Sequence, residues 1–472
     1  MRVEMETVVS IRGKRKIMLN GYVYVKQKNL AKGAISYECE LRRGSGRTGS
    51  ICKARVKLAH DLSILEFVNE HSHAPNEAHC EVLQVRAHIK RRAVQTEEPA
   101  QQILGLKLQH LSQQAAVELT PLPTIRRAIR SCKQKVNAVH PLPKTRSFPI
   151  PDEYKTLDNG EDFLLYDSGQ LDPNRIIVFG TNRAARLLIE SQNWFMDGTF
   201  KIVPQLFYQL YSVHALNRGD VIPCLYVLLS NKTEDTYTRL FTDIKALIPA
   251  LDPLTVTMDY EKAAMNAATA AFPNAVINGC FYHLAQSVYR NVQAAGLQQR
   301  YQVDADFALA ARMLPALAFV PIPQVIDYFE TVQANAPDAL APVIDYFEDN
   351  YVGRLRRQGR RAAPRYPIAV WNVHDRVEND LPRTNNSVEG WNRKMQTAVS
   401  GHHPNIWRFL GILKREQNIN NAHMDQLLGG HEPPPQRKKY RDCNTRIVTI
   451  ARDFYQRDAL QYLRGVAHNI SF

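Results

Sequence analysis

The alternation of hydrophobic and polar positions changes three times along this chain of 472 residues. In residues 7–68, apolar and polar positions alternate over short segments, and turn-forming pairs such as Asn20-Gly21 separate them. This pattern predicts a small antiparallel sheet, which is nearly too small to bury a core of its own. The expected strands are 7–11, 16–19, 22–26, 35–41, 52–58 and 63–68.

Residues 77–150 are polar and basic, and their pattern favours helices. Two prolines precede a run that contains Arg126, Arg127 and Arg130, which favours a short helix that contacts DNA. A charged helix that only bridges two domains fits the same residues equally well. Four prolines in residues 141–151 indicate a hinge into the next domain.

From residue 156 onward, long apolar segments alternate with segments of helical periodicity. Three strands followed by a helix, a strand, a helix and a strand predict a mixed sheet with helices packed on it. Counted from the strand at 194–200, this is the order expected of a ribonuclease-H-like domain. In such a domain the first and fourth strands, here 194–200 and 255–259, lie side by side. The expected strands are 175–180, 194–200, 206–216, 221–230, 255–259 and 276–281, and the expected helices are 234–248, 261–271 and 285–296.

The rest of the chain has a helical pattern. An insertion at about residues 300–365 interrupts the α/β region, and its expected helices are 304–317, 322–335 and 339–351. Two further helices, 405–428 and 445–463, are expected on either side of three prolines at 433–435. The sequence thus predicts an α/β protein with a helical insertion, preceded by a small antiparallel β domain. The predicted domains are 7–76, 77–150, 156–400 and 401–472.

Positive charge is concentrated in two regions of the chain. Residues 1–150 hold 26 of the 60 Lys and Arg residues but only 12 of the 46 Asp and Glu residues. Residues 354–415 hold 13 basic and 4 acidic residues, whereas residues 151–353 are acidic. Basic regions on both sides of an acidic core favour a polyanionic partner, most simply DNA, over charge that serves solubility alone.

Six arginines lie within twelve residues that begin at Arg354. Arg354, Arg356 and Arg357 are candidates to neutralise DNA phosphates, and a solvated loop is the alternative. Trp371 and Trp391 are candidates to stack on an unpaired base, although core packing fits both of them better.

The cysteine and hydropathy patterns narrow the class of protein. The seven cysteines are odd in number and widely spaced, and the N-terminus lacks the apolar run of a signal peptide. We therefore expect reduced thiols, some of them metal ligands, rather than a disulfide framework. No stretch approaches the roughly 20 apolar residues that cross a bilayer, so we expect no membrane segment.

Four residues of the β domain have the spacing of a metal site. Cys39 and Cys52 lie on neighbouring expected strands, and His71 and His73 follow with the overall spacing C-x12-C-x18-H-x-H. Two thiolates and two imidazoles make a closed tetrahedral zinc shell of the structural kind. The alternative is two core cysteines and two surface histidines.

The segments around these residues resemble a FLYWCH-type zinc finger over about residues 8–75. They read G-Y-V-Y-V-K from Gly21, I-S-Y-E-C to Cys39, C-K-A-R from Cys52 and H-S-H-A-P from His71. The tryptophan usual after the first tyrosine of this family is absent, and Tyr24 or a neighbour holds its place. The resemblance implies a zinc-stabilised sheet that contacts DNA or, in some members, protein.

Three acidic residues suggest a second kind of metal site. Asp197 ends the apolar stretch W-F-M-D-G-T-F, and Asp259 ends L-T-V-T-M-D-Y-E in the same way. Glu389 lies in R-T-N-N-S-V-E-G-W-N, where Thr384 or Asn385 can cap a new helix. Such carboxylates suit a pair of Mg²⁺ ions that catalyse phosphodiester cleavage. A single Asp at a strand end is, however, more often structural or solvated.

The motifs around these acids resemble the MULE (Mutator-like element) transposase domain over about residues 193–398. The resemblance implies a DDE- or DDD-type transposase in which Asp197, Asp259 and Glu389 bind catalytic metal. The family also shares the C-x-x-H pair Cys280 and His283. These two could bind a metal, contact DNA or pack structurally; we favour a structural or DNA-positioning role, with His283 the more functional of the two.

These observations predict a DNA transposase that binds element ends and performs metal-dependent strand cleavage and transfer. It would use structural Zn²⁺ and catalytic Mg²⁺ or Mn²⁺, act as a homo-oligomer on DNA, and reside in the nucleus. The alternative is a domesticated, non-catalytic DNA-binding or regulatory protein on the same scaffold. A third interpretation makes the finger a protein-interaction module. Basic runs such as R-G-K-R-K from Arg12 fit nuclear import and DNA contact alike.

Overall fold

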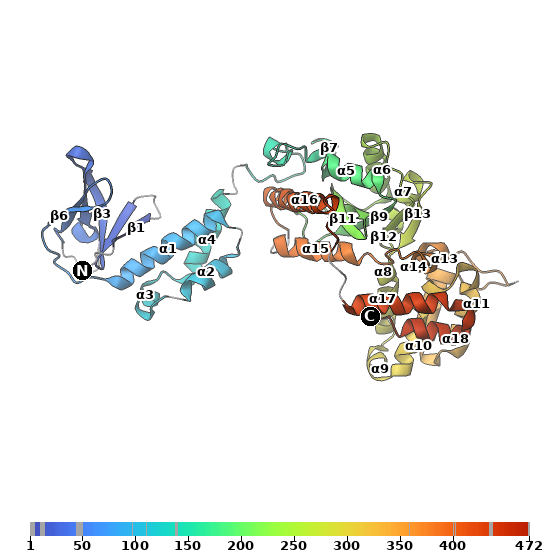
Figure 1. Cartoon of the computed structure of the whole chain (residues 1–472). Helices are drawn as coiled ribbons and strands as arrows, with labels where there is room; N and C mark the ends of the chain where they lie inside the picture. Colours follow the sequence, from blue (N-terminus) through green and yellow to red (C-terminus); the bar gives the residue numbers. More distant parts are fainter. Residues whose placement is uncertain are drawn as a thin grey trace. The chain divides into compact units, whose positions relative to one another are not determined.

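The computed structural model describes residues 5–9, 15–43, 51–96, 98–109, 111–136, 140–357, 359–399, 401, 403–433 and 438–470. The chain divides into two compact units, Met1–Pro141 and Leu142–Phe472 (Figure 1). The first three residues of the basic run at Arg12, the glycine-rich loop after Arg43 and most of the triple proline lie outside the described residues.

The first unit contains a six-stranded antiparallel sheet in which each strand pairs with the next along the chain. All six expected strands are present: β1 Met5–Val9, β2 Arg15–Leu19, β3 Tyr22–Asn29, β4 Ile35–Cys39, β5 Arg55–Leu58 and β6 Ile64–Val68. Asn20 and Gly21 both have positive φ in the two-residue turn between β2 and β3, as a tight hairpin requires. A Cβ on Gly21 would lie 2.7 Å from Pro75 Cβ, so this glycine also lets the chain after His73 pack against the turn.

The sheet has a small core, and four helices follow it. The core residues are Ile17, Leu19, Tyr24, Tyr37, Val56 and Leu58. The helices are α1 Glu77–Gln95, α2 Ala100–Leu108, α3 Gln113–Glu118 and α4 Leu122–Val136. Cys80 of α1 packs with Val8, Met18 and Val23 of the sheet, so the sheet and the helices share a boundary.

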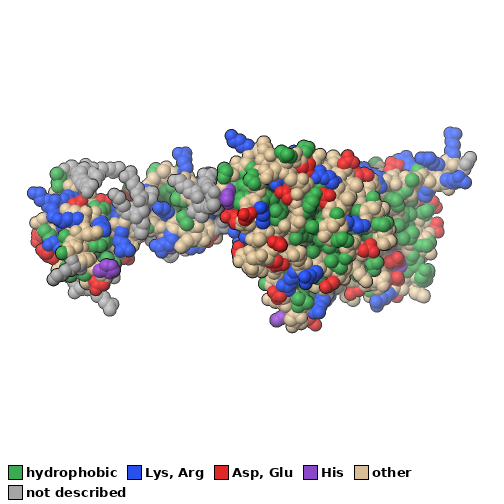
Figure 2. All heavy atoms as spheres, turned by 90° about the horizontal axis from the view of Figure 1, so that it is seen from above, with side chains coloured by type: hydrophobic (Ala, Val, Ile, Leu, Met, Phe, Trp, Pro, Cys, Tyr) green, Lys and Arg blue, Asp and Glu red, His purple; other side chains and the backbone are tan. Residues whose placement is uncertain are grey.

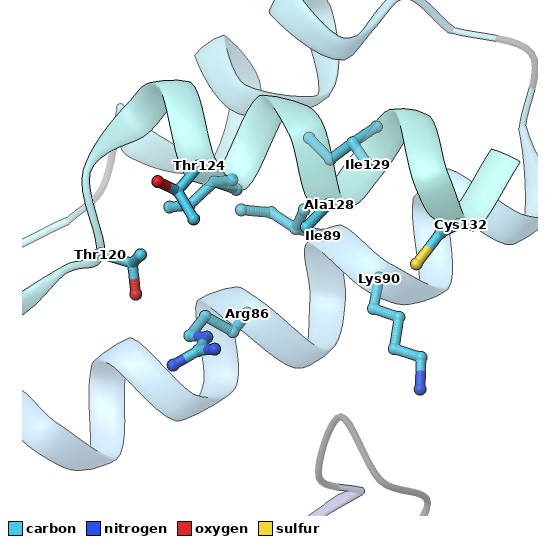
Figure 3. A pocket seen from close by; sticks show the side chains of 9 residues that line it. Arg86, Ile89, Lys90, Thr120, Thr124, Ala128, Ile129 and Cys132 are labelled. Carbon is cyan, nitrogen blue, oxygen red and sulfur yellow. The ribbon is translucent and has the colours of Figure 1, made fainter. Parts of the chain in front are cut away.

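Helices α1 and α4 enclose a shallow, mostly apolar groove (Figure 3). Ile89 from α1 and Ile125 and Ile129 from α4 line it, and they also contribute to the core of the helical segment. Arg86 and Lys90 of α1 stand at its edge, as Figure 3 shows. The apolar face of α4 is therefore turned toward α1.

The second unit is built on a seven-stranded mixed sheet with the order β13-β12-β9-β10-β11-β8-β7. β12 pairs parallel with both β9 and β13, and the other neighbours are antiparallel. The predicted adjacency of the Asp197 and Asp259 strands is thus confirmed. The strands are β7 Leu164–Asp167, β8 Ile177–Gly180, β9 Asn193–Thr199, β10 Gln209–Asn217, β11 Asp220–Leu229, β12 Thr255–Met258 and β13 Val276–Gly279.

Helices cover both faces of this sheet (Figure 1). On one face, Trp194 and Met196 pack with residues of α5 Asn182–Glu190, α6 Glu234–Leu247, α7 Lys262–Ala271 and α8 Phe281–Ala294. On the other, Phe179 and Tyr226 pack with α15 Asn386–Val399 and α16 Ile406–Leu428. Side chains alternate along β9, so Asp197 points to the face that α15 covers.

The insertion and the end of the chain pack together as a helical lobe. The insertion contributes α9 Gln298–Val303, α10 Ala305–Ala316, α11 Val325–Asn335 and α12 Ala341–Phe347, and α13 Ile368–Trp371 and α14 His374–Glu378 follow. The helix expected at 445–463 was wrong in extent: α17 Lys438–Arg452 and α18 Ala459–Ala467 are separate. Asp458 starts α18 by accepting a hydrogen bond from the Gln461 N–H, and this cap breaks the run.

Strand β7 and helix α5 were not anticipated from the sequence. None of the helices in the described residues is long and apolar enough to cross a membrane.

Candidate metal centres

The predicted zinc ligands converge in the first unit. The ligand atoms of Cys39, Cys52, His71 and His73 all lie within 4.8 Å of one another. Cys39 Sγ lies 3.3 Å from His73 Nε2, Cys52 Sγ lies 3.4 Å from His71 Nδ1, and the two ligand nitrogens are 3.3 Å apart. Ligands about 2.0–2.3 Å from a shared tetrahedral centre are separated by similar distances, so the set fits a zinc ion.

Both histidines are oriented by a hydrogen bond at the nitrogen that faces away from the cluster. Tyr24 Oη lies 2.7 Å from His71 Nε2, and His73 Nδ1 lies 2.9 Å from the Ala74 carbonyl oxygen. The ring of Tyr22 stacks on His71 at 3.6 Å between centroids. Such outer contacts fix the tautomer and orientation of metal-binding imidazoles. Tyr24 therefore has a defined contact in the place where the family's tryptophan is missing.

Asp197 and Asp259 are brought side by side by strand register. Thr255, Val256 and Thr257 of β12 pair with Asn193, Trp194 and Phe195 of β9. Two residues further along each parallel strand, Asp259 comes next to Asp197. Both carboxylates therefore reach the same edge of the sheet, as the sequence predicted.

Helix α15 is fixed to this edge at its first turn. The Asn385 side chain donates from Nδ2 to the Met196 carbonyl oxygen at 3.2 Å, and the Asn385 N–H donates to Cys280 Sγ at 3.2 Å. Thr384 and Asn385 were the two residues expected to cap this helix; Asn385 Oδ1 has no hydrogen-bond partner in the described part of the chain, so the Asn385 side chain does not cap it. It instead joins α15 to β9, and Cys280 contributes by packing and by accepting this bond.

His283 lies between two of the predicted metal ligands. Its Nδ1 is 2.7 Å from Asp259 Oδ1, and its Nε2 is 3.7 Å from Glu389 Oε1. Although burial disfavours a charged ring, the contacts with Asp259 and Cys280 raise the pKa of His283 to about 11. A protonated imidazole here holds the two carboxylates together.

Asn392 was not singled out by the sequence, yet it binds the remaining aspartate. Its Nδ2 donates to Asp197 Oδ2, and the Gly198 N–H donates to Asp197 Oδ1 at 2.8 Å. Asn392 follows Glu389 by three positions and so shares its helix face. The spacing E-x-x-N in the quoted motif was the available signal. One face of α15 thus contacts Asp197 through Asn392 and approaches Asp259 through Glu389 and His283.

Glu261 is a further acidic residue that the sequence did not select. It lies two residues beyond Asp259, and it shares hydrogen bonding with Tyr237. Burial raises its pKa, while the positive charge of Lys232 and the hydroxyl of Tyr237 oppose that rise. Lys232 is therefore a cation close to this cluster of carboxylates.

The acidic cluster is electrostatically strained without a cation. Burial, reinforced by the charge of Asp259, raises the pKa of Asp197 to about 8. Burial and Asp259 also raise the pKa of Glu389, against the opposing charges of His283 and Arg393. Carboxylates this close together repel when ionised, and a divalent cation removes the repulsion.

Asn392 Oδ1 has no hydrogen-bond partner among the described residues, and Asp259 Oδ1 and Glu389 Oε1 face the His283 ring in the ion pairs given above. All three are hard oxygen atoms, which are the ligands that Mg²⁺ and Mn²⁺ prefer. The donor set therefore fits a divalent cation. Asp197, Asp259 and Glu389 are nevertheless not among the described groups whose ligand atoms all lie within 4.8 Å, because His283 lies between Asp259 and Glu389.

The predicted DNA-contacting arginines occupy two places. Arg127 and Arg130 are exposed on α4, and Arg126 beside them is partly buried. They belong to the first unit, on the helix whose apolar residues pack against α1.

The arginine-rich run of the second unit forms a short hairpin. Leu355 and Arg361 make an antiparallel bridge, and Arg361 pairs with Glu348 at 2.7 Å, which anchors the hairpin. Arg354 is half-exposed and pairs with Asp349, whereas Arg356 and Arg357 are exposed. Figure 2 shows Lys and Arg side chains gathered on a projection of the second unit.

The first unit thus has the ligand set of a Cys₂His₂ zinc protein, and the second is an α/β domain with acidic residues at the ends of parallel strands. Residues 7–73 match the family model of the FLYWCH zinc finger domain, and residues 193–287 match that of the MULE transposase domain. The search among curated proteins returns no match.

The two matches confirm the resemblance seen in the sequence and support a Mutator-like, transposase-related DNA-binding protein. The first match, together with the Cys₂His₂ cluster, supports a structural zinc ion. The second spans Asp197, Asp259, Cys280 and His283, whereas Glu389 lies beyond it.

Proposed function

We propose that this protein is an active DDE-type DNA transposase of the Mutator-like class. In this proposal Asp197, Asp259 and Glu389 hold Mg²⁺ or Mn²⁺ and catalyse DNA strand cleavage and transfer. The observation that carries it is the meeting of the three acidic residues, from β9, the end of β12 and α15, at one edge of the sheet. Their carboxylate oxygens, two of which face the His283 ring, would give a divalent cation ligands there.

The strand order supports a ribonuclease-H-like domain at the centre of the second unit. Counted from β9, the third, second, first, fourth and fifth strands lie in that order across the sheet, and only the last two pairings are parallel. β8 and β7 extend the sheet beyond the third strand. This arrangement gives the first and fourth strands a shared edge for acidic ligands.

In this proposal, some side chains at the acidic site would bind the metal and others would position those ligands. Divalent ions, when bound, activate a water or a 3′-OH as nucleophile and stabilise the leaving oxygen. Asp197 and Asp259 would provide ligands from a rigid sheet, and Glu389 would complete the set from α15. Asn392 orients Asp197, and His283 holds Asp259 and Glu389 in positions from which they would bind a cation.

The first unit would bind the DNA ends. The zinc finger and the exposed arginines of α4 supply positive charge for phosphate contacts. Arg356 and Arg357, exposed on the hairpin of the second unit, would add phosphate contacts. In this proposal the partners are element ends and target DNA, the acting form is a homo-oligomer, and the location is the nucleus.

The proposal is tested with a labelled duplex that carries candidate element ends, in Mg²⁺ or Mn²⁺. Wild type is compared with Asp259→Asn and with the exposed control Asp252→Asn. We expect metal-dependent nicking or joining by wild type and the control. In Asp259→Asn the rate should fall by about a thousandfold, because the loss of metal-mediated charge stabilisation amounts to several kcal/mol.

The same experiment separates the alternative. Binding without cleavage by wild type, across several candidate ends, would reject the enzyme and favour a non-catalytic DNA-binding protein. Cleavage that persists in Asp259→Asn would reject the assignment of this carboxylate.

A further inference from the structure

Two large aromatic side chains are exposed close to the acidic site. Phe200 is 40% exposed and Tyr208 is 46% exposed, and their rings contact each other with centroids 5.4 Å apart in an edge-to-face arrangement. Aromatic rings usually bury most of their surface, because exposure forfeits the hydrophobic free energy of burial. A contacting pair that stays accessible is therefore a candidate binding surface.

Both residues lie at the edge of the sheet that carries Asp197. Phe200 follows Asp197 by three positions, directly after β9 ends at Thr199. Tyr208 precedes β10, and its N–H donates to the Leu229 carbonyl oxygen at 2.8 Å. Because Leu210 of β10 pairs with Thr199 of β9, the antiparallel register places Tyr208 beside the residues that follow β9.

A lysine completes this surface and links it to the carboxylates. Lys232 is exposed, and its Nζ lies 5.8 Å from the centroid of the Phe200 ring. The same lysine lies close enough to Glu261 to act on it electrostatically, and Glu261 follows Asp259 by two positions. The aromatic pair itself is joined to the acidic site through β9, because Phe200 follows Asp197 by three positions.

The tryptophans considered from the sequence are not available for such a role. Trp371 is fully buried, and Trp391 is 8% exposed. Trp391 donates from Nε1 to Glu416 at 3.0 Å and stacks on Tyr226 beneath α15. Both are core residues, which confirms the packing role that their sequence context favoured.

We propose that Phe200 and Tyr208 form a stacking site for an unpaired nucleobase of the DNA strand beside the acidic site. Lys232 pairs with the phosphate next to that base. The proposal rests on the proposed transposase function and names a DNA subsite for it. An exposed aromatic face next to a cation matches the base and phosphate of a single strand, which alternate between apolar ring and negative charge.

The chemistry of the acidic site supplies the reason for such a subsite. Where a DNA end opens beside the metal site, its unpaired bases lose their stacking neighbours. A protein ring that replaces the lost stacking partner holds the strand in place at low cost. Aromatic stacking tolerates any base, so the site would act at ends of any terminal sequence.

The test uses the full-length, zinc-loaded protein in buffer without Mg²⁺ or Mn²⁺, with a short oligothymidylate that carries one iododeoxyuridine. Irradiation crosslinks the halogenated base to an aromatic side chain in contact with it, and peptide mapping identifies the residue. We expect crosslinks at Phe200 or Tyr208. Phe200→Leu should reduce this crosslink at least about fivefold, the lower end of the effect of losing one base–aromatic stack.

Matched variants separate stacking from general damage. Phe200→Trp should retain the crosslink, because it keeps a ring, and Tyr455→Leu, an exposed tyrosine elsewhere in the second unit, should leave it unchanged. Lys232→Ala should weaken the crosslink, and Lys232→Arg should restore it. Thermal unfolding followed by tryptophan fluorescence verifies that each variant is folded.

Crosslinks confined to the first unit, or a crosslink that Phe200→Leu leaves at full strength, would overturn the stacking site. If Phe200 and Tyr208 bind a protein segment and not the oligonucleotide, the stacking site is also overturned. Since the crosslink is measured without Mg²⁺ or Mn²⁺, it can succeed when cleavage fails, and the two proposals fail separately.

Discussion

The two units hold their candidate metal ligands in opposite ways. In the first unit, the ligands come from residues 39–73, and their ligand atoms lie within 4.8 Å of one another. Each histidine has its outer nitrogen in a hydrogen bond. In the second unit, the ligands come from three elements between residues 197 and 389, and the His283 ring lies between Asp259 and Glu389.

The zinc cluster of the first unit stabilises the fold around it, whereas the acidic residues of the second unit are held together by the rest of that unit's fold. A closed zinc shell contributes folding free energy to a sheet whose core is too small. A crowded set of carboxylates costs folding free energy until a cation binds, and active sites commonly carry such a cost. Removing one ligand should therefore have opposite effects on stability in the two units.

The largest expected effect is the loss of the zinc finger in Cys52→Ser. A serine hydroxyl is a poor zinc ligand, so the protein should lose its zinc, and the sheet of β1–β6 should unfold. Hydrogen exchange of residues 15–43 and 51–73 and the zinc content measure this loss. All four tryptophans lie in the second unit, so tryptophan fluorescence should show that unit unchanged.

Cys132→Ser is the matched control for this prediction, because Cys132 lies in the same unit outside the zinc cluster. It should keep the zinc content of wild type. A Cys52→Ser protein with full zinc content and unchanged exchange would show that the cluster is two core cysteines and two surface histidines.

The second prediction is that Asp197→Asn stabilises the metal-free second unit, on the order of 2 kcal/mol at pH 8–9. The Gly198 N–H can still donate to the new amide oxygen, and Asn392 can offer its unpartnered Oδ1 to the new amide nitrogen after rotation. The variant thus keeps the contacts and loses the buried charge. Thermal or urea unfolding in EDTA, followed by tryptophan fluorescence, measures the effect.

The pH dependence of this effect has a definite sign. The folded-state pKa of Asp197 is raised from 3.8 to about 8, so the folded chain binds the proton more tightly than the unfolded chain. Wild type therefore loses stability as the pH rises through the window from about 4 to about 8. The advantage of Asp197→Asn should grow across that window and vanish near pH 4. Equal stability of wild type and Asp197→Asn at pH 9 would contradict the proposed electrostatic strain. The difference between wild type and the control Asp252→Asn should not change with pH in this way.

A smaller effect is expected for Asn392→Ala, which removes a residue that orients Asp197. Loss of an outer-shell partner typically lowers metal affinity or activity by about 10–100-fold. The Mn²⁺ concentration for half-maximal cleavage should rise by such a factor, with less change in the rate at saturating metal. Thr397→Ala, an exposed change on the same helix, is the control. A fall in rate that extra Mn²⁺ does not restore would indicate a role in the reaction itself.

The features that could be predicted from the sequence are those that local patterns decide. The alternation in residues 16–68, the apolar strands that end at Asp197 and Asp259, and the Cys/His spacing all depend on residues close together in the chain. The meeting of Asp197 and Asp259 also follows from parallel strands. The position of the Glu389 helix agrees with the expected cap motif, although Asn385 performs another task.

The features that could not be predicted depend on tertiary packing. The Asn385 side chain donates a hydrogen bond to the Met196 carbonyl oxygen rather than capping its own helix, because β9 lies beside it. His283 could have faced a metal, DNA or the core, and only the positions of α8 and α15 decide that it lies between two carboxylates. The division of the C-terminal helix depends on α18 packing with Phe319 and other residues of the insertion.

The smallest effect concerns the outer contacts of the zinc cluster and compares two neighbouring tyrosines. Tyr24→Phe removes the hydroxyl that lies 2.7 Å from His71 Nε2. Tyr22→Phe keeps the ring that stacks on His71 and removes a hydroxyl that donates to the His73 carbonyl oxygen at 3.3 Å, not to a ring nitrogen. We expect zinc affinity to fall about tenfold in Tyr24→Phe and to change little in Tyr22→Phe. Titration with Co²⁺, whose absorption reports thiolate ligation, measures the first unit without interference from the acidic residues of the second. Equal zinc affinities in the two variants would show that packing alone orients His71. The use of an outer hydrogen bond to orient a metal ligand would then be limited to the second unit, where Asn392 binds Asp197.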